Sequence, residues 1–518
     1  MATTANPRKQ LVLVAMIFAV AMTSIDMTIV SIAVPEIQKE LALSATGVQW
    51  IVNGYLLALA ALFALGGRLS DTLGHRKMVF VGMIIFVSAS IMCGLTPTGD
   101  IAEGWIVTFR VVQGAGAAIM YPAALAIVVS AFPVRERGRA LAVFFAVAGG
   151  LTSVGPLAGG FLSEWDWRAI FWVNVPVGII ALVLTVMSKP DDSYERAPLD
   201  LRGAILIAAG MGISVLGLQQ ASVWGWSNPA TWGCIAGGLA LLVVFVVVEL
   251  ATRSPLIEMR IFASRSFFVD NVVLFISMIA FVPVFFFASM YSQISLGYSA
   301  SSAGLYLLVF FAGFAPASQV GGRILDKVGA RPAVILGNLV AAVGFGLWAW
   351  KLTDLSLGSQ WPFIVLAGAG IGLMLSPANT DALNRAPRLS YGEATGITQT
   401  VRNFGSSLGM AVLGTILISV NRSQVESSLG DLGLSKSRAD EVASALSQSA
   451  GGAPSGFGGK GAAAQKLYEA VQLDFAQSCR VVFFVMAAVM GIALLASLFL
   501  PAGRAAEQPL EAREPSSV

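Results

Sequence analysis

The chain has 518 residues, of which 56% are hydrophobic and only 12% are charged. Soluble proteins carry about 25% charged residues, so this composition excludes an ordinary water-soluble domain. Lys and Arg number 32 against 29 Asp and Glu, and the net charge of +3 is too small and too dispersed to indicate a nucleic-acid-binding protein.

Long apolar segments recur along almost the whole sequence, each long enough to cross a hydrocarbon core of roughly 30 Å. Breaks at charged, polar and Gly/Pro-rich clusters divide them into fourteen predicted membrane-spanning helices. In chain order the predicted spans lie near residues 11–34, 47–66, 77–96, 104–128, 138–161, 168–187, 201–220, 231–250, 267–289, 303–322, 332–350, 361–380, 395–419 and 480–500. The sequence therefore predicts an all-α polytopic membrane protein.

Positive side chains are unevenly distributed among the connections between these spans. Lys and Arg are retained on the cytoplasmic side of short loops, so their positions predict orientation. They gather at every second connection, at Arg8, Lys9, Arg76, Lys77, Arg135, Arg137, Arg139, Lys189, Arg196, Arg202, Arg253, Arg260, Arg265, Lys327, Arg331, Arg385, Arg388 and Arg504. The alternate short loops offer only Lys39, Arg168 and Lys351. Both termini are therefore predicted to be cytoplasmic, and residues 1–10 to lead into a first span rather than form a cleaved signal.

One sequence repeat relates the two halves of the chain. GGRLSDTLGHRK at residues 66–77 returns as GGRILDKVGARP at residues 321–332, with six of twelve positions identical. Each copy follows an even-numbered span, which predicts parallel repeats related by an axis along the membrane normal. The predicted domains are a six-helix bundle at residues 1–190, an inserted two-helix hairpin at 198–250, a second six-helix bundle at 260–500 and a tail at 501–518.

The predicted external loop at residues 421–479 is longer than the other connections. Its Gly-, Ala- and Ser-rich segment from Ser447 to Ala464 indicates a flexible stretch. Ser435–Gln448 and Gln465–Cys479 are expected to form short surface helices. A simple tether and a lid over the external mouth are both compatible with this pattern.

The repeated segment also carries the first family resemblance. GGRLSDTLGHRK resembles the motif after the second span of the major facilitator superfamily, with Gly67, Asp71, Gly74, Arg76 and Lys77 at its positions. Glycines allow close approach of helix ends, and a carboxylate beside cations can form a contact that breaks and reforms. The resemblance implies a conformational latch favouring the outward-facing state; the alternative is a solvated turn. The second copy supplies the corresponding residues Gly322, Asp326, Gly329 and Arg331.

Two further segments resemble motifs of proton antiporters in this superfamily. RVVQGAGAA at residues 110–118 is similar to the fourth-span motif and places Arg110 roughly 9 Å inside its span. Such a charge needs a cavity or a partner unless it reaches the outer interface. GPLAGGFL at residues 155–162 resembles the fifth-span motif that separates exporters from importers, although Leu151 replaces its usual first glycine. Its site residues are Gly155, Pro156, Gly159 and Gly160, and generic helix packing is the alternative.

The first span contains a carboxylate with no charged neighbour in the same span. IDMTIVSIAVP at residues 25–35 resembles the first-span motif of the fourteen-span drug:proton antiporters, and Asp26 lies about 12 Å from the outer end. Burial and a nearby Arg shift a carboxyl group in opposite directions, so it can be poised to take and release a proton. Because Asp26 and Arg110 have similar depth, we hypothesise that they face one cavity and exchange partners. A fixed structural ion pair is the alternative.

The resemblance to the fourteen-span branch extends over most of the chain, through WIVNGYLL at 50–57, WRAIFWVNVPVG at 167–178, LDLRGAILI at 199–207 and YGEATGITQTVRNFGSSLG at 391–409. Arg402 lies about 10 Å inside its span. It is expected to contact substrate, the proton path or the seam between the halves, or to serve packing. Asn53 stands where some dication exporters of this branch carry an acid, which argues against strong dication selectivity.

The resemblance implies proton-coupled efflux of lipophilic, cationic drugs or related small molecules by alternating access. The expected setting is a bacterial inner membrane, with the proton gradient as the energy source, no other cofactor, no nucleic acid, no metal site and a monomeric protein. No phosphate-binding loop or catalytic motif is present, so an enzyme is not expected. The alternatives are a lipid or metabolite transporter on the same fold and a membrane sensor that does not transport.

Overall fold

The computed structural model describes residues 8–133, 136, 140, 143–144, 147, 150–189, 199–386, 391–431 and 462–503. Within these ranges the regular structure is entirely helical, as the sequence predicts. The first half of the chain forms the following helices: α1 (Lys9–Leu41), α2 (Ala45–Leu73), α3 (His75–Gly94), α4 (Ala102–Ala131), α6 (Val154–Trp165), α7 (Ala169–Trp172) and α8 (Asn174–Ser188).

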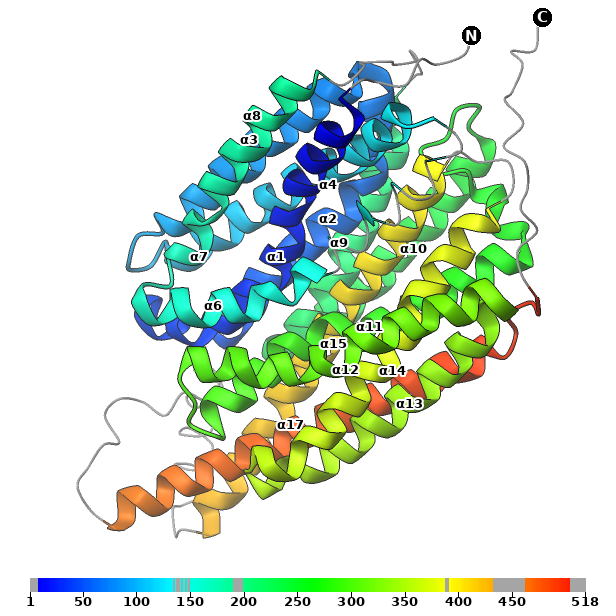
Figure 1. The fold of residues 1–518 in the computed structure, drawn as a ribbon. Helices are drawn as coiled ribbons and strands as arrows, with labels where there is room; N and C mark the ends of the chain where they lie inside the picture. The colour runs from blue at the N-terminus through cyan, green and yellow to red at the C-terminus, as the bar shows by residue number, and fades with distance from the viewer. Residues whose placement is uncertain are drawn as a thin grey trace, which may run out of the picture.

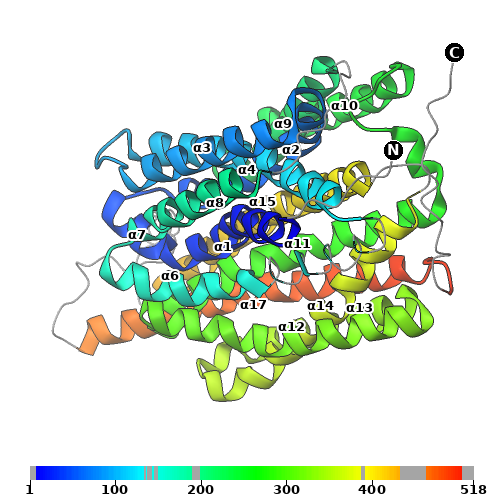
Figure 2. The same ribbon diagram turned by 45° about the horizontal axis from the view of Figure 1, so that its top comes forward.

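The hairpin and the second half follow. They comprise α9 (Leu201–Trp224), α10 (Pro229–Ala251), η1 (Met259–Ala263), α11 (Arg265–Ile294), α12 (Ala300–Val328), α13 (Ala330–Lys351), η2 (Leu352–Asp354), α14 (Leu357–Asn384), α15 (Tyr391–Asp431) and α17 (Ala462–Ser497). In Figure 1 the helices of the two halves form two neighbouring groups. α9 and α10 pack against each other, and α9 also packs against α2 and α15 (Figure 2).

Thirteen helices in the described ranges are long and apolar enough to cross a membrane. They match thirteen of the fourteen predicted spans. The remaining predicted span, at residues 138–161, lies partly outside the described residues, and its described helix, α6, has 12 residues. The predicted all-α polytopic fold is therefore confirmed, whereas the orientation of the termini stays a prediction.

The helices beside the predicted external loop are longer than expected. α15 continues to Asp431, and α17 begins at Ala462. Gln465–Cys479 is therefore part of one continuous helix with the last span rather than a separate surface helix. Ser435–Gln448 and most of the Gly-rich segment fall outside the described residues. Hydropathy did not predict this extension, because polar residues at the end of a long helix have the same low hydropathy as a loop.

The internal repeat extends well beyond the twelve-residue motif. α2 and α12 have 29 residues each, and both begin after a serine, Ser44 or Ser299, whose side chain accepts a hydrogen bond from the third backbone N–H of the helix. Gly74 and Gly329 end these helices with φ angles of 101° and 94°, a conformation that glycine adopts without strain. The two halves therefore share local backbone geometry as well as sequence.

Matching glycines also set the helix packing within each half. A Cβ on Gly82 of α3 would meet the Gly116 carbonyl oxygen and the Met120 Cβ and N atoms of α4, each at 2.7 Å. Gly337 of α13 faces the equivalent atoms of α14 at the same distances, namely the Gly370 carbonyl oxygen and the Met374 Cβ and N atoms. Such backbone contact requires residues without a side chain. Each half is thus built around the same α3–α4 or α13–α14 crossing.

Candidate functional site: a buried ion pair beside a two-bundle seam

A short, buried ion pair in the N-terminal half joins Asp26 of α1 to Arg110 of α4. An Arg110 terminal nitrogen donates to the Asp26 Oδ2 atom at 2.6 Å. Both residues are almost completely buried, with exposed fractions of 0% and 1%. Their similar predicted depth therefore corresponds to a direct contact. Removing one partner of a buried pair costs about 3–5 kcal/mol because the other charge is left without compensation.

Neighbouring groups fix the geometry of this pair. Gln113 donates to the Asp26 Oδ1 atom at 2.9 Å and accepts from Arg110 at 2.8 Å. The Arg110 Nε atom donates to the Ile51 backbone oxygen of α2 at 2.8 Å, and the guanidinium lies 4.5 Å from the centre of the Tyr55 ring. Gln113 and Tyr55 are not among the site residues that the sequence predicted. Gln113 had a readable signal, since a polar residue three positions after Arg110 lies on the same helix face.

Tight packing connects the Asp26 segment to the other half of the protein through α6. Cβ atoms built on Gly155 and Gly159 would meet the backbone oxygens of Ile25 and Ile29 of α1 at 2.9 and 2.8 Å. One on Gly160 would meet the Ala300 backbone oxygen of α12 at 2.7 Å. α6 therefore lies between the α1 turn that carries Asp26 and the start of α12.

Pro156 takes part in the same close approach, since a Cβ on Gly304 of α12 would collide with the Pro156 backbone oxygen. Gly155, Pro156, Gly159 and Gly160 thus make the close packing that the sequence suggested. The contact joins the two halves at the end of the bundle where α1 finishes.

Arg402 of α15 lies at the seam between the halves and is partly exposed. It donates to Gln399 at 2.7 Å and to Asn379 of α14 at 3.3 Å. Gln399 also interacts with Tyr121 of α4, which belongs to the N-terminal half. Of the roles that the sequence left open for Arg402, this position favours a contact at the seam between the two halves.

Asn53 is fully buried where α2, α9 and α15 meet. Its amide donates to Gln219 at 2.6 Å, and its oxygen accepts from Ser407 at 2.6 Å. These contacts tie the inserted hairpin to helices from both halves. Asn53 is therefore a junction residue in this conformation.

The latch residues lie near the ends of α2 and α12 opposite to the α6–α12 contact. Asp71 is 4.0 Å from the His75 Nδ1 atom, and Arg76 lies over the Phe80 ring at 5.8 Å. In the second copy Arg331 donates to the Leu498 backbone oxygen at 3.1 Å, and Asp326 is exposed. Lys77, at the start of α3, is also exposed.

The glycine at the close helix contact is one residue earlier than expected. A Cβ on Gly66 or Gly321 would collide with the Ala118 or Leu373 backbone oxygen, whereas Gly67 has only Pro122 at 3.8 Å and Gly322 has no neighbour within 4 Å. The motif predicted a close approach correctly but not its register.

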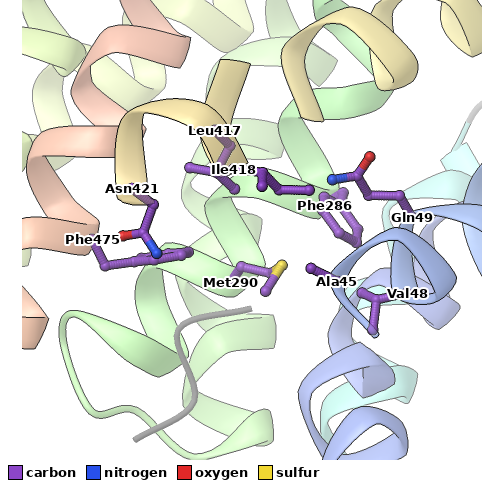
Figure 3. Close-up of a pocket in the computed structure, with 9 residues that line it drawn as sticks. All are labelled: Ala45, Val48, Gln49, Phe286, Met290, Leu417, Ile418, Asn421 and Phe475. Atoms are coloured by element: carbon purple, nitrogen blue, oxygen red, sulfur yellow. The ribbon is translucent and has the colours of Figure 1, made fainter. Parts of the chain in front are cut away.

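Among the described residues, the end of the seam near the α6–α12 contact is tightly packed. A cavity of about 20 Å³ lies there between α2, α11, α15 and α17, with Gln49, Met290 and Phe475 among its lining residues (Figure 3). This volume holds about one water molecule. Three consecutive aromatic residues of α11, Phe285, Phe286 and Phe287, are buried nearby. Entry of a larger compound from this end would require the halves to separate.

Membrane-length helices, a repeated helix arrangement and a buried charge pair are features of a polytopic membrane transporter. The chain belongs to the Major Facilitator Superfamily, whose family model matches residues 16–410. It is 34% identical over 412 residues to the tetracenomycin C resistance and export protein of Streptomyces glaucescens, covering 79% of this chain and 76% of that protein.

Two further comparisons agree with this family assignment. The cephamycin export protein CmcT of Amycolatopsis lactamdurans is 35% identical over 409 residues, covering 76% of this chain and 81% of that protein. A solved structure of a bacterial homologue of the human lysosomal transporter Spinster aligns with a TM-score of 0.60 and 18% identity, covering 96% of this chain and 98% of that one. The expected superfamily and fold are therefore confirmed.

Proposed function

We propose that the protein exports lipophilic small molecules, including cationic drugs, across a bacterial cytoplasmic membrane in exchange for protons. The observation that carries this proposal is the buried pair of Asp26 and Arg110. The names of the two curated relatives, both export proteins, support the direction of transport.

Asp26 is the proposed proton-binding group. A proton on its carboxylate removes the negative charge that holds Arg110 and Gln113, so their hydrogen bonds to Asp26 weaken. The α1 turn that bears Asp26 is packed on α6, which in turn contacts α12. Protonation at Asp26 is thereby coupled to the contact that closes one end of the seam.

Alternating access supplies the rest of the proposed mechanism. The two bundles rock about a central site, and each half-cycle exposes it to one side of the membrane. A membrane potential of 100 mV provides about 2.3 kcal/mol for each charge moved, which supports a substrate gradient of roughly fifty-fold before any pH gradient is added.

The proposal is tested with the purified protein in acid-loaded liposomes that contain a pH-sensitive dye. Ethidium and tetraphenylphosphonium serve as cationic probes, beside a neutral compound of similar size. We expect added probe to cause proton release from wild-type vesicles and not from Asp26→Asn vesicles. Glu36→Gln is the matched control, because Glu36 is an exposed carboxylate on the same helix.

Two results would contradict the proposal. Equal probe flux with and without a pH gradient in wild type and Asp26→Asn would indicate an uncoupled facilitator or lipid carrier. Tight probe binding without any flux would indicate a sensor. Proton release by the neutral compound alone would retain antiport but exclude the preference for cations.

A further inference from the structure

A second pair of buried acids lies in the C-terminal half, outside the Asp26 site. Asp270 lies five residues after the start of α11, about 8 Å into the helix. Asp381 lies three residues before the end of α14. Their exposed fractions are 0% and 1%, and α11 packs against α14 so that the two buried carboxyl groups act on each other.

The hydrogen-bond partners of this pair are incomplete. The Asp381 Oδ2 atom accepts from the Arg385 Nε atom at 2.7 Å. The Asp381 Oδ1 atom and both Asp270 oxygens are buried and accept no hydrogen bond from any described group. Two ionised carboxylates can only accept, so neither satisfies the other, whereas a single added proton makes one of them a donor.

The local charges also indicate that the two carboxyl groups share one proton. The charged groups that act most strongly on Asp270 are Asp381 of α14 and Arg385, the residue that follows this helix. Arg402 of α15 is directed to Gln399 and Asn379, and Glu258 and Arg260 beside α11 are exposed. One guanidinium balances one carboxylate. Two like charges cannot both remain ionised at such close range in a buried site.

We propose that Asp270 and Asp381 form a proton-binding dyad, in which one shared proton bridges the two carboxyl groups and Arg385 balances the remaining negative charge. Binding forms one O–H bond, and release returns that proton to water. A metal cation is disfavoured because Arg385 already supplies a positive charge and two carboxylates leave most ligand positions of a hard cation empty. This inference deepens the proposed function, since it adds a second proton site to an antiporter.

Infrared difference spectroscopy of the purified protein in detergent, recorded over a series of pH values, tests the dyad without transport. The wild-type minus Asp270→Asn spectrum is expected to contain the C=O stretch of a protonated carboxyl group, shifted in D₂O. The same band should appear in the Asp26→Asn minus Asp26→Asn/Asp270→Asn spectrum, so it does not depend on Asp26. The matched control, wild type minus Glu258→Gln, should lack it.

Thermal unfolding provides a second readout. Loss of the shared proton leaves two facing buried charges, so the wild-type unfolding temperature should fall as the pH is raised through the release of this proton. The Asp270→Asn substitution introduces an amide that can donate to Asp381 at any pH, so this variant should lack that fall. Should Asp270→Asn not fold, Asp381→Asn replaces it in the same spectra.

Absence of the carboxyl band from every difference spectrum would overturn the dyad. Loss of the band when NaCl replaces choline chloride at constant pH would also overturn it, because this loss would indicate a cation site. Failure of the proposed function is separable from both results. It would appear as unchanged proton flux in Asp26→Asn liposomes, while the spectra still report on Asp270.

Discussion

Gln219 of the inserted hairpin accepts a hydrogen bond of 2.6 Å from Asn53 of α2, and both side chains are fully buried. The same Asn53 accepts from Ser407 of α15. The Thr415 hydroxyl of α15 also donates to the Leu218 backbone oxygen of α9 at 2.8 Å. The hairpin is therefore attached to the seam between the halves rather than only to the outside of one bundle.

We expect Asn53→Ala to destabilise the protein, because it leaves Gln219 and Ser407 without their buried partner. Each unsatisfied buried group costs about 1–3 kcal/mol. Thermal unfolding of Asn53→Ala, Gln219→Ala and the double variant measures the coupling. Contacting residues give coupling energies of about 0.5–3 kcal/mol. Simple additivity of the two single effects would show that the observed hydrogen bond contributes nothing.

Arg110→Lys should fold but lose most proton-coupled transport. A lysine keeps the positive charge opposite Asp26, yet its single ammonium group cannot reproduce the separate guanidinium contacts to Asp26, Gln113 and the Ile51 oxygen. Arg110→Ala should be less stable by about 3–5 kcal/mol, since Asp26 then loses its counter-ion. Liposome flux and unfolding curves distinguish the two variants. Full transport by Arg110→Lys would reduce the role of Arg110 to charge alone.

Gly160→Ala should weaken the α6–α12 contact, because the new methyl group would lie 2.7 Å from the Ala300 oxygen and from the Ser301 Cα atom. Neither backbone atom can move without shifting α12. Gly150→Ala is the control, since a Cβ at Gly150 has no neighbour within 4 Å. Spin labels at Trp165→Cys and Leu305→Cys, in a background without native cysteines, measure the separation of the helix ends. We expect the distance between the two labels to be longer in Gly160→Ala than in the parent protein, and unchanged in Gly150→Ala.

An unchanged distance distribution in Gly160→Ala would contradict a gating role for this contact. A loss of folded protein in that variant and not in Gly150→Ala would assign Gly160 to packing alone. Both labelled positions are exposed, so the labels themselves should not disturb the core.

The sequence predicted the helices, the repeat and the shared level of Asp26 and Arg110, because these depend on hydropathy and on distance along one helix. It did not predict that Arg110 reaches the Ile51 oxygen or that Gly66, rather than Gly67, makes the close contact. Those features depend on the rotation of one helix against another, which neither hydropathy nor the sequence repeat determines.

Asp270 and Asp381 illustrate the same limit. Asp270 lies near the start of a predicted span and Asp381 just beyond the end of another, so each alone suggests an interfacial carboxylate. Their partnership joins residues 111 positions apart. An acid within a membrane helix is itself a signal for function, but only the packing of α11 against α14 shows that the two acids meet.

The final prediction concerns acid pH at the closed end of the seam. Glu164 of α6 lies beyond the predicted fifth span and accepts hydrogen bonds from the Ser301 hydroxyl at 2.5 Å and the Ser301 backbone N–H at 3.3 Å. Hydrogen bonds from Ser301 and Ser299 lower the pKa of the Glu164 carboxyl group below its usual value of 4.5.

A lowered pKa in the closed state means that the contribution of Glu164 is fully present above its ordinary pKa and is lost as the pH falls through the lowered value. We therefore expect the Trp165–Leu305 label distance to lengthen below about pH 4.5 in the labelled protein. Glu164→Gln should show a distance that does not change over this range, because its amide does not titrate. An identical pH response in Glu164→Gln would assign the opening to another acid group and exclude Glu164 as its cause.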